Sequence, residues 1–203
     1  RAAHYLRYLD ELGLLLALIP ELAKSKGVDQ PTTHFWDVFD HSLQTVATIE
    51  FLIRENAWEC GSEDILATVP WSDAIDLHLS QEVSSGSNHK VLLKLGGLFH
   101  DIAKPKTKFL DDTGRAHFYG HTKEGAIMTA SILERLRFSN QEIKLVESFV
   151  YHHLRPAQMA NKELPTQRAI YRYFHDTGDA GIDILVLALA DYLATHGPLL
   201  DIE

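Results

Sequence analysis

An adjacent histidine and aspartate stand inside an otherwise apolar segment, LLKLGGLFHDIAKPK, which covers residues 92–106. His100 and Asp101 follow a run with the composition of a buried helix, and Lys104 comes three residues after the aspartate. A buried carboxylate without a partner costs several kcal/mol or takes up a proton. Because neutral imidazole and carboxylate are common metal ligands, the pair points to a cation that satisfies both.

The same conflict between apolar surroundings and polar side chains recurs along the chain. His41 interrupts DVFDHSLQTV, His121 opens HTKEGAIMTA, and Asp191 ends ILVLALAD. In FVYHHLRP, the helical wheel puts His153 near the middle of an apolar face and His152 nearer its edge. A hydrogen-bonded core histidine is the alternative for any one of these residues alone. Two carboxylates and several imidazoles together instead predict a shared cation site.

The ligand types restrict which ion such a site would hold. Imidazole and carboxylate without thiolate suit Fe, Mn, Co, Ni or Zn, with Mg as a further candidate. Cys60 is the single cysteine, which excludes a CxxC zinc site and an intrachain disulfide. A bound ion of this kind lowers the pKa of water and makes hydroxide available near neutral pH. We therefore expect a hydrolytic site with one or two divalent ions of open identity.

Almost every segment that would position these residues has the apolar periodicity of an α-helix. Pro20 interrupts the first helix, Ser139 and Glu142 form a capping box, and Thr166 caps a later helix. The predicted helices cover residues 2–25, 37–54, 91–103, 122–137, 140–154, 166–176 and 180–195. Over residues 55–88 we expect a loop, one or two helices and a second loop. Over residues 107–119 we expect one short β ribbon. The expected fold class is an all-α helical bundle.

The length, charge and hydropathy of the chain limit its domain number and the partners that we expect for it. With 203 residues, we expect a single domain with a helical extension over residues 1–30 and a metal-binding core over 31–203. The formal charge of −9 argues against a broad basic surface for nucleic acid. The uncharged apolar run 184–190 is too short to cross a bilayer, so we expect no membrane partner. The single cysteine fits a cytoplasmic protein.

Four of the polar residues carry a resemblance to a known family. His41, the His100–Asp101 doublet and Asp191 resemble the H…HD…D signature of the HD-domain metal-dependent phosphohydrolases. The resemblance implies an HD-type helical bundle in which these four residues hold a first metal ion. The flanking apolar helices and the spacing of the four positions fit the same family.

Two further histidines match subgroups of this family that hold a second metal. The resemblance implies that Asp101 bridges to a second ion held by His121 and His153. His152 is the alternative to His153, but the H-x-R-P context of the family favours His153. No role is assigned to His4, His34, His78, His89, His117, His175 and His196.

A closer resemblance lies in LGLLLALIPELAKSKGVDQ, FWDVFDHSLQT, FYGHTKEGA and HHLRP. These segments are similar to the HD-type tail of the bacterial tRNA nucleotidyltransferase / poly(A) polymerase family. In that family a nucleotidyltransferase head precedes the tail, and this sequence has no Gly-Ser followed by an Asp-x-Asp pair on a strand. The start at Arg1 leads us to expect a tail without its covalent N-terminal head domain, or a free-standing relative.

Two basic residues are candidates for binding a substrate phosphate. Lys104 would share a helix face with His100, and Arg155 follows His153 closely; a solvated lysine at a helix end is the alternative for Lys104. We expect His100, Asp101 and Lys104 to be the catalytic residues. Lys106, Lys108 and Arg115 make the neighbouring stretch locally basic, either as a lip for phosphate or RNA or as a solvated loop.

Two functions follow from these expectations. The first is a metal-dependent phosphohydrolase for a phosphomonoester or phosphodiester, with a phosphorylated small molecule, a nucleotide or an RNA end as substrate. The second is an RNA-binding tail module, with tRNA as a candidate partner and a metal site that is structural or vestigial. Intact ligands favour the first, because a scaffold could fill the same space with apolar residues.

Overall fold

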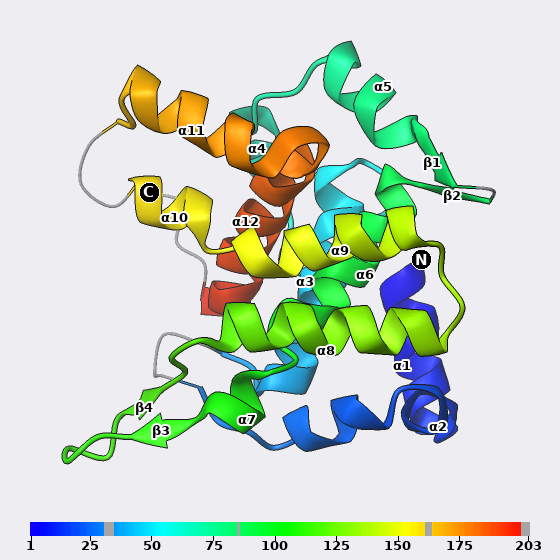
Figure 1. Cartoon of the computed structure of the whole chain (residues 1–203), viewed down its shortest axis with the longest axis vertical. Coiled ribbons are helices and arrows are strands. Elements are labelled where there is room, and N and C mark those ends of the chain that lie inside the picture. Colours follow the sequence, from blue (N-terminus) through cyan, green and yellow to red (C-terminus); the bar gives the residue numbers. More distant parts are fainter. Residues whose placement is uncertain (31–34, 85, 161–163, 200–203) are drawn as a thin grey trace.

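The computed structural model describes residues 1–30, 35–84, 86–160 and 164–199, and over these residues the protein is an all-α bundle, as predicted (Figure 1). Its α-helices are α1 (Ala2–Glu11), α2 (Leu14–Leu18), α3 (Val38–Leu52), α4 (Glu63–Thr68), α5 (Asp73–Ser80), α6 (His89–Phe99), α7 (Lys104–Thr107), α8 (His121–Arg135), α9 (Asn140–His152), α10 (Arg155–Ala160), α11 (Gln167–Thr177) and α12 (Gly181–His196). The 3-10 helices are η1 (Pro20–Ser25), η2 (Gly178–Ala180) and η3 (Gly197–Leu199). The predicted boundary between residues 30 and 31 adjoins residues outside this description and stays a prediction.

The core lies where α3, α6, α9 and α12 meet (Figure 1). Each helix contributes an apolar side chain with no exposed surface, namely Val46, Leu92, Phe149 and Leu187. Helix α8 runs alongside α9, and α1 packs on α3. The six predicted metal ligands lie on α3, α8 and α12 or directly after the ends of α6 and α9, so the bundle itself determines where they meet.

Two glycines let neighbouring helices approach α6 closely. A Cβ atom at Gly97 would stand 2.6 Å from Ile49 Cδ1 of α3. At Gly96 it would stand 3.0 Å from Phe149 Cδ2 of α9. Glycine at both positions lowers helix propensity but allows close packing of the neighbouring helices. This explains an adjacent glycine pair inside a core helix.

The N-terminal helix and α6 end earlier than the sequence predicts. The helix predicted over residues 2–25 is interrupted at Pro20, as expected, but it also breaks at Gly13, which has a φ of 73°. The helix predicted over residues 91–103 ends at Phe99. Beyond it, Ile102 N bonds to Phe99 O and Lys104 N to Asp101 O, so three-residue turns replace the α-helical ladder.

The strands form two ribbons where the sequence predicts one. Strands β3 (Phe109–Leu110) and β4 (Ala116–His117) form the expected antiparallel ribbon. A second ribbon pairs β1 (Glu82–Ser84) with β2 (Ser87–Asn88), in a segment that the sequence analysis treats as a loop. Short polar strands of this kind lack the apolar alternation that predicts a strand. The predicted capping box of Ser139 and Glu142 and the Thr166 cap are both present.

The C-terminal stretch from Gln167 to Leu199 is long and apolar enough, by length and composition, to cross a membrane. In the structure η2 divides this stretch into α11 and α12. Core helices of globular proteins meet the same criterion. The apolar residues of α12 pack in this way, with Ile184, Leu187 and Ala190 fully buried against the bundle.

Candidate metal centre

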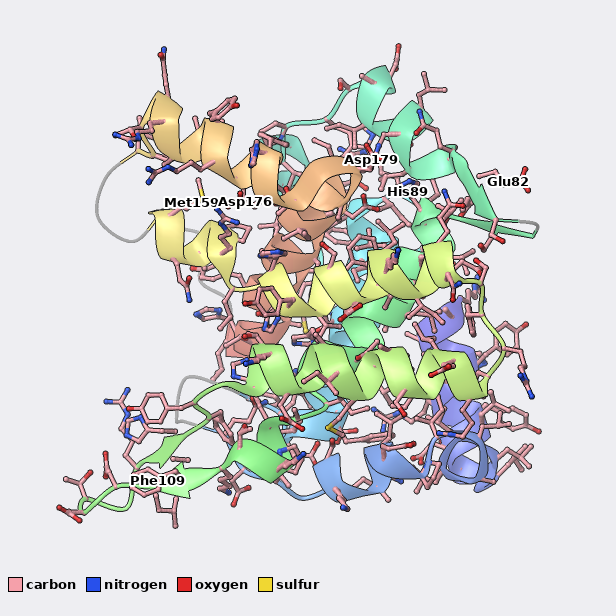
Figure 2. The ribbon with its side chains drawn as sticks, viewed as in Figure 1. Glu82, His89, Phe109, Met159, Asp176 and Asp179 are labelled. Carbon is pink, nitrogen blue, oxygen red and sulfur yellow. The ribbon has the colours of Figure 1, made fainter. Side chains whose placement is uncertain are left out.

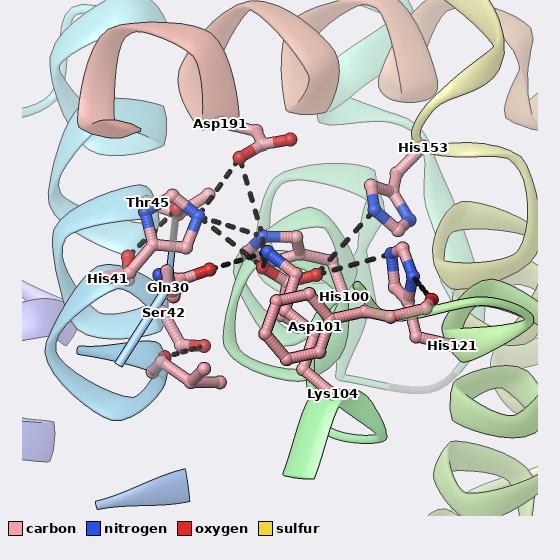
Figure 3. A network of polar contacts seen from close by, with 12 residues as sticks. Gln30, His41, Ser42, Thr45, His100, Asp101, Lys104, His121, His153 and Asp191 are labelled. Atoms are coloured by element: carbon pink, nitrogen blue, oxygen red, sulfur yellow. Dashed lines mark hydrogen bonds and ion pairs between the residues drawn. The ribbon is translucent and has the colours of Figure 1, made fainter. Parts of the chain in front are cut away.

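Six predicted ligands from five places in the chain converge in the middle of the bundle (Figure 3). Helix α3 supplies one, the turn after α6 two, the start of α8 one, the residue after α9 one and α12 one. We call these residues the core cluster: His41, His100, Asp101, His121, His153 and Asp191. At most 8% of the surface of the first five is exposed, and the side chain of Asp191 is 19% exposed. The residues brought together are the six that the sequence predicts.

Four atoms form the first half of the core cluster. His41 Nε2 lies 2.9 Å from Asp191 Oδ1 and 3.2 Å from His100 Nε2. His100 Nε2 lies 3.2 Å from Asp101 Oδ2 and 3.6 Å from Asp191 Oδ1. Ligands about 2.0–2.2 Å from an ion stand roughly 3–3.5 Å apart from one another, depending on the coordination geometry. The four atoms therefore have the mutual spacing of a metal-ligand set.

Three atoms form the second half. Asp101 Oδ1 lies 3.5 Å from His121 Nε2 and 3.8 Å from His153 Nε2, distances too long for hydrogen bonds. Among the described residues, none of these three buried atoms has a hydrogen-bond partner. Asp101 stands between the halves and turns one carboxylate oxygen toward each (Figure 3). The arrangement suits a carboxylate that bridges two cations.

Backbone carbonyls set the orientation of three of the imidazoles. The Nδ1–H groups of His100, His121 and His153 donate to the carbonyls of Gly97, Phe118 and Val150 respectively, at 2.8, 2.7 and 2.7 Å. Each acceptor is three residues earlier in the chain, so the local turn fixes the ring. With Nδ1 protonated, Nε2 faces the centre of the cluster. Metal-binding histidines are oriented by the same kind of bond.

Burial and the two carboxylates, Asp101 and Asp191, determine the pKa values inside the cluster. Burial opposes charge on His100, but Asp101 and Asp191 outweigh it and raise the pKa of His100 to about 10. Burial and then the charge of His100 lower the pKa of His153 to about 4. Burial also opposes ionisation of Asp101 and Asp191, yet His100 and the other neighbouring cationic groups hold both pKa values well below the usual range. The cluster thus favours positive charge at its centre.

Lys104 belongs to the same network and is only 8% exposed. Its Nζ lies 2.6 Å from Asp101 Oδ2 and donates to Gln30 Oε1 at 2.6 Å. The reading of this residue as a solvated lysine at a helix end is therefore wrong. The turns after α6 bring it back toward the doublet, although α6 itself ends at Phe99. The sequence does not predict a role for Gln30, since nothing local marks a glutamine as the partner of a lysine 74 residues away.

A cleft of about 810 Å³ borders the second half of the core cluster. His121, Tyr119 and His152 are among its lining residues, and so is Arg155. Arg155 does not reach the core cluster, because its Nη2 donates to Asp176 Oδ2 at 2.6 Å on the rim. A substrate that enters by this cleft would therefore meet Arg155 before the cluster.

The neighbouring basic stretch is partly neutralised by ion pairs and hydrogen bonds. Lys106 pairs with Glu124, and Lys108 Nζ donates to the carbonyl of Asp29 at 3.3 Å. Arg115 lines the cleft. Of these three residues, only Arg115 faces the space through which a phosphate could approach the core cluster. The sequence predicts one basic stretch, whereas the structure gives the three side chains different surroundings.

Comparisons with known proteins found a family model and several relatives that match most of this chain. A family model described as HD domain matches residues 38–196. Over 199 residues, the chain is 31% identical to the A-adding tRNA nucleotidyltransferase of Deinococcus radiodurans and 30% identical to the CC-adding tRNA nucleotidyltransferase of Thermus thermophilus. Each of these matches covers 97% of this chain but 37% of the relative. The bifunctional uridylyltransferase/uridylyl-removing enzyme of Ruegeria pomeroyi is 27% identical over 158 residues, which cover 77% of this chain and 14% of that protein.

Proposed function

The chain belongs to the HD domain family, and on that premise we propose that it is a metal-dependent phosphohydrolase acting on a phosphomonoester or phosphodiester of a nucleotide or RNA end. The six residues of the core cluster are the proposed ligands of one or two divalent ions. The family supports this class of reaction in general. The particular substrate is inferred from the cleft and from the chemistry named in the relatives.

The state of Asp101 carries the proposal. Its Oδ1 is buried, ionised and without a hydrogen-bond partner in the described part of the chain. Two imidazole nitrogens that also lack such partners, those of His121 and His153, face it at 3.5 and 3.8 Å. A protein core rarely leaves three adjacent polar atoms unsatisfied. A cation at this place would interact with all three atoms. Without it, each buried polar atom would lack a partner, and this would lower the stability of the folded protein.

The residues of the site would have different roles in phosphoryl hydrolysis. A divalent ion held by the core cluster would supply Lewis-acid polarisation of a phosphoryl oxygen and make a water more acidic. The backbone carbonyls of Gly97, Phe118 and Val150 keep three imidazoles in position. Lys104 presents a buried ammonium beside Asp101, where it can balance negative charge that develops on a phosphoryl group.

The cleft next to His121 provides a route for the substrate. Tyr119 is 73% exposed and its ring stacks on that of His117, with centroids 5.3 Å apart and an interplanar angle of 5°. Both residues line the cleft together with Arg155. An exposed aromatic ring can stack on a nucleobase, and an arginine can bind phosphate oxygens. These features support a nucleotide or RNA end over a small phosphate ester without a base.

Hydrolysis of model substrates tests the proposal. The purified chain, supplied with Mn²⁺ or Ni²⁺, should cleave an aryl phosphodiester or a 2′,3′-cyclic nucleotide, and a chelator should stop the reaction. His100→Ala and Asp101→Ala should each abolish turnover, while His4→Gln, on the exposed surface of α1, should retain it. Turnover that survives in both core variants would rule out this site.

The similarity to tRNA nucleotidyltransferases over 97% of the chain favours a second candidate, an RNA-binding tail module. The chain spans only 37% of the length of these relatives, so their activities are proposals for this chain. A tRNA-binding assay at several salt concentrations, beside metal analysis, separates the two. Tight, salt-sensitive tRNA binding by protein that takes up no metal would favour the tail module over the hydrolase.

A further inference from the structure

Two histidines without a predicted role meet an aspartate outside the core cluster. His78 lies in the last turn of α5, His89 is the first residue of α6, and Asp183 lies in the first turn of α12. His78 Nε2 is 2.7 Å from Asp183 Oδ2, and His89 Nδ1 is 3.0 Å from the same oxygen and 3.1 Å from Oδ1. We call these three residues the outer cluster. All three ligand atoms lie within 4.8 Å of one another.

The outer cluster is buried on one side and open on the other. Asp183 has no exposed surface, and His89 is 6% exposed. The side chain of His78 is 19% exposed. His78 and His89 line a cleft of about 400 Å³, together with Glu82 and Asp179. Figure 2 shows Asp179 and His89 near the facing ends of α5, α9 and α11. The cleft thus gives the cluster access to solvent and two further carboxylates at its border.

The ligand types and their spacing suit a borderline divalent ion. Two imidazoles and one carboxylate are the protein ligands of many zinc sites that keep a fourth position open. Ligands about 2.0–2.2 Å from zinc stand roughly 3.3 Å apart in a tetrahedron. The observed spacings to Asp183 are a few tenths of an ångström shorter, as expected where hydrogen bonds take the place of an ion. We propose that His78, His89 and Asp183 form a metal site for Zn²⁺ or a similar ion, separate from the core cluster.

The position of the site indicates what a bound ion would do there. Helix α5 has eight residues, of which only Leu79 is buried. Little apolar surface therefore fastens this helix to the bundle. An ion held by the outer cluster would join α5 to α6 and α12, which are central helices. Binding to the folded state alone would stabilise the protein according to the free ion concentration.

Metal titration of the chelator-treated chain tests the proposal without reference to hydrolysis. Titration with Co²⁺, followed by the visible absorption of tetrahedral cobalt, should show one more equivalent in the wild-type chain than in His78→Gln. If weak binding remains in His78→Gln, its dissociation constant should be at least about tenfold higher. His4→Gln, an exposed histidine on α1, is the matched control and should keep every equivalent. Equal titrations of wild type and His78→Gln would overturn the proposal.

A second variant separates ligation from a general effect on the fold. His78→Cys places a thiolate, which also binds zinc and cobalt, near the same position. It should restore the equivalent that His78→Gln loses, with the spectral change of a sulfur ligand. Loss of the equivalent from both variants would also contradict direct ligation by residue 78. Failure of the hydrolase proposal would leave this titration unaffected, because the core cluster is unchanged in all three variants.

Discussion

The core cluster and the outer cluster take residues from different positions along the same two helices, α6 and α12. Helix α6 begins with His89 and is followed by His100, while α12 carries Asp183 and, eight residues later, Asp191. At 1.5 Å per residue the two positions on α12 are about 12 Å apart along the axis. Both clusters combine imidazole with buried carboxylate, yet their hydrogen bonding differs.

The difference is whether the imidazole nitrogen that faces the carboxylate forms a hydrogen bond with it. In the core cluster, backbone carbonyls accept from the Nδ1–H groups of His121 and His153, and their Nε2 atoms face Asp101 without a hydrogen-bond partner among the described residues. In the outer cluster, His78 and His89 each direct a hydrogen-bonding nitrogen at Asp183. Asp183 in the outer cluster therefore has hydrogen-bond partners, whereas Asp101 Oδ1 in the core cluster has none among the described residues. Residue types alone do not distinguish the two cases.

A matched pair of substitutions gives the largest expected contrast. His153→Gln removes a proposed core ligand and should lower kcat/KM for an aryl phosphodiester on the order of 10²-fold. His78→Gln, which makes the same change in the outer cluster, should leave kcat/KM within about twofold at saturating metal, since it lies on a different cleft. Steady-state kinetics checks both. Equal losses in the two variants would mean that the clusters act as one site.

A pair of lysines should show a smaller effect. Lys104→Gln removes the buried ammonium beside Asp101 and should lower kcat/KM by about 10- to 100-fold, mainly through kcat. Lys106→Gln is the control, because this lysine lies two residues away and pairs with Glu124 on the surface. It should change kcat/KM by less than about threefold. A large drop in both variants would assign the effect to the overall charge of the segment.

The sequence predicts the core cluster more completely than the outer one. His41, Asp101 and Asp191 stand out because each interrupts an apolar run, and the turn geometry that orients His121 and His153 is local. His78 and His89 lie in a polar segment with weak periodicity, where a histidine raises no conflict with its neighbours.

What brings the outer cluster together is tertiary structure that periodicity does not encode. The β1–β2 ribbon connects α5 to α6 and so sets where His78 meets His89. Its strands are two or three residues long and mostly polar, so no alternating pattern predicts them. Asp183 is recognisable as a candidate ligand only once α12 is placed against these two elements. The helices themselves are predictable, because their apolar faces repeat over several turns.

The shared helix α6 allows a test of how firmly each cluster depends on packing. Gly97→Ala would place a Cβ atom 2.6 Å from Ile49 Cδ1, and the carbonyl of Gly97 accepts from His100 Nδ1. Overpacking should outweigh the gain in helix propensity and lower the free energy of unfolding by about 1–2 kcal/mol. Urea denaturation measures the change. Cobalt titration should show weaker binding to the core cluster and unchanged binding to the outer one.

Gly96→Ala is the control for this substitution. It gains the same helix propensity, and its Cβ atom would meet Phe149 Cδ2 at 3.0 Å, a looser fit. The loss of stability should therefore be smaller. If Gly96→Ala is the more damaging of the two, the packing of α6 on α9 rather than on α3 limits the position of the core cluster.

The capping box at the start of α9 should give the smallest effect and should leave both clusters equally intact. Ser139 Oγ accepts from Glu142 N, and the Glu142 carboxylate accepts from Ser139 N, while His153 follows the other end of this helix. Ser139→Ala should lower the free energy of unfolding by about 1 kcal/mol. Ser131→Ala, an exposed serine within α8, should change it by less than about 0.5 kcal/mol. The cap lies at the far end of α9 from His153 and contacts none of the proposed ligands, so kcat/KM and the number of cobalt equivalents should not change. Loss of a cobalt equivalent in Ser139→Ala would show that the core cluster depends on the whole length of α9.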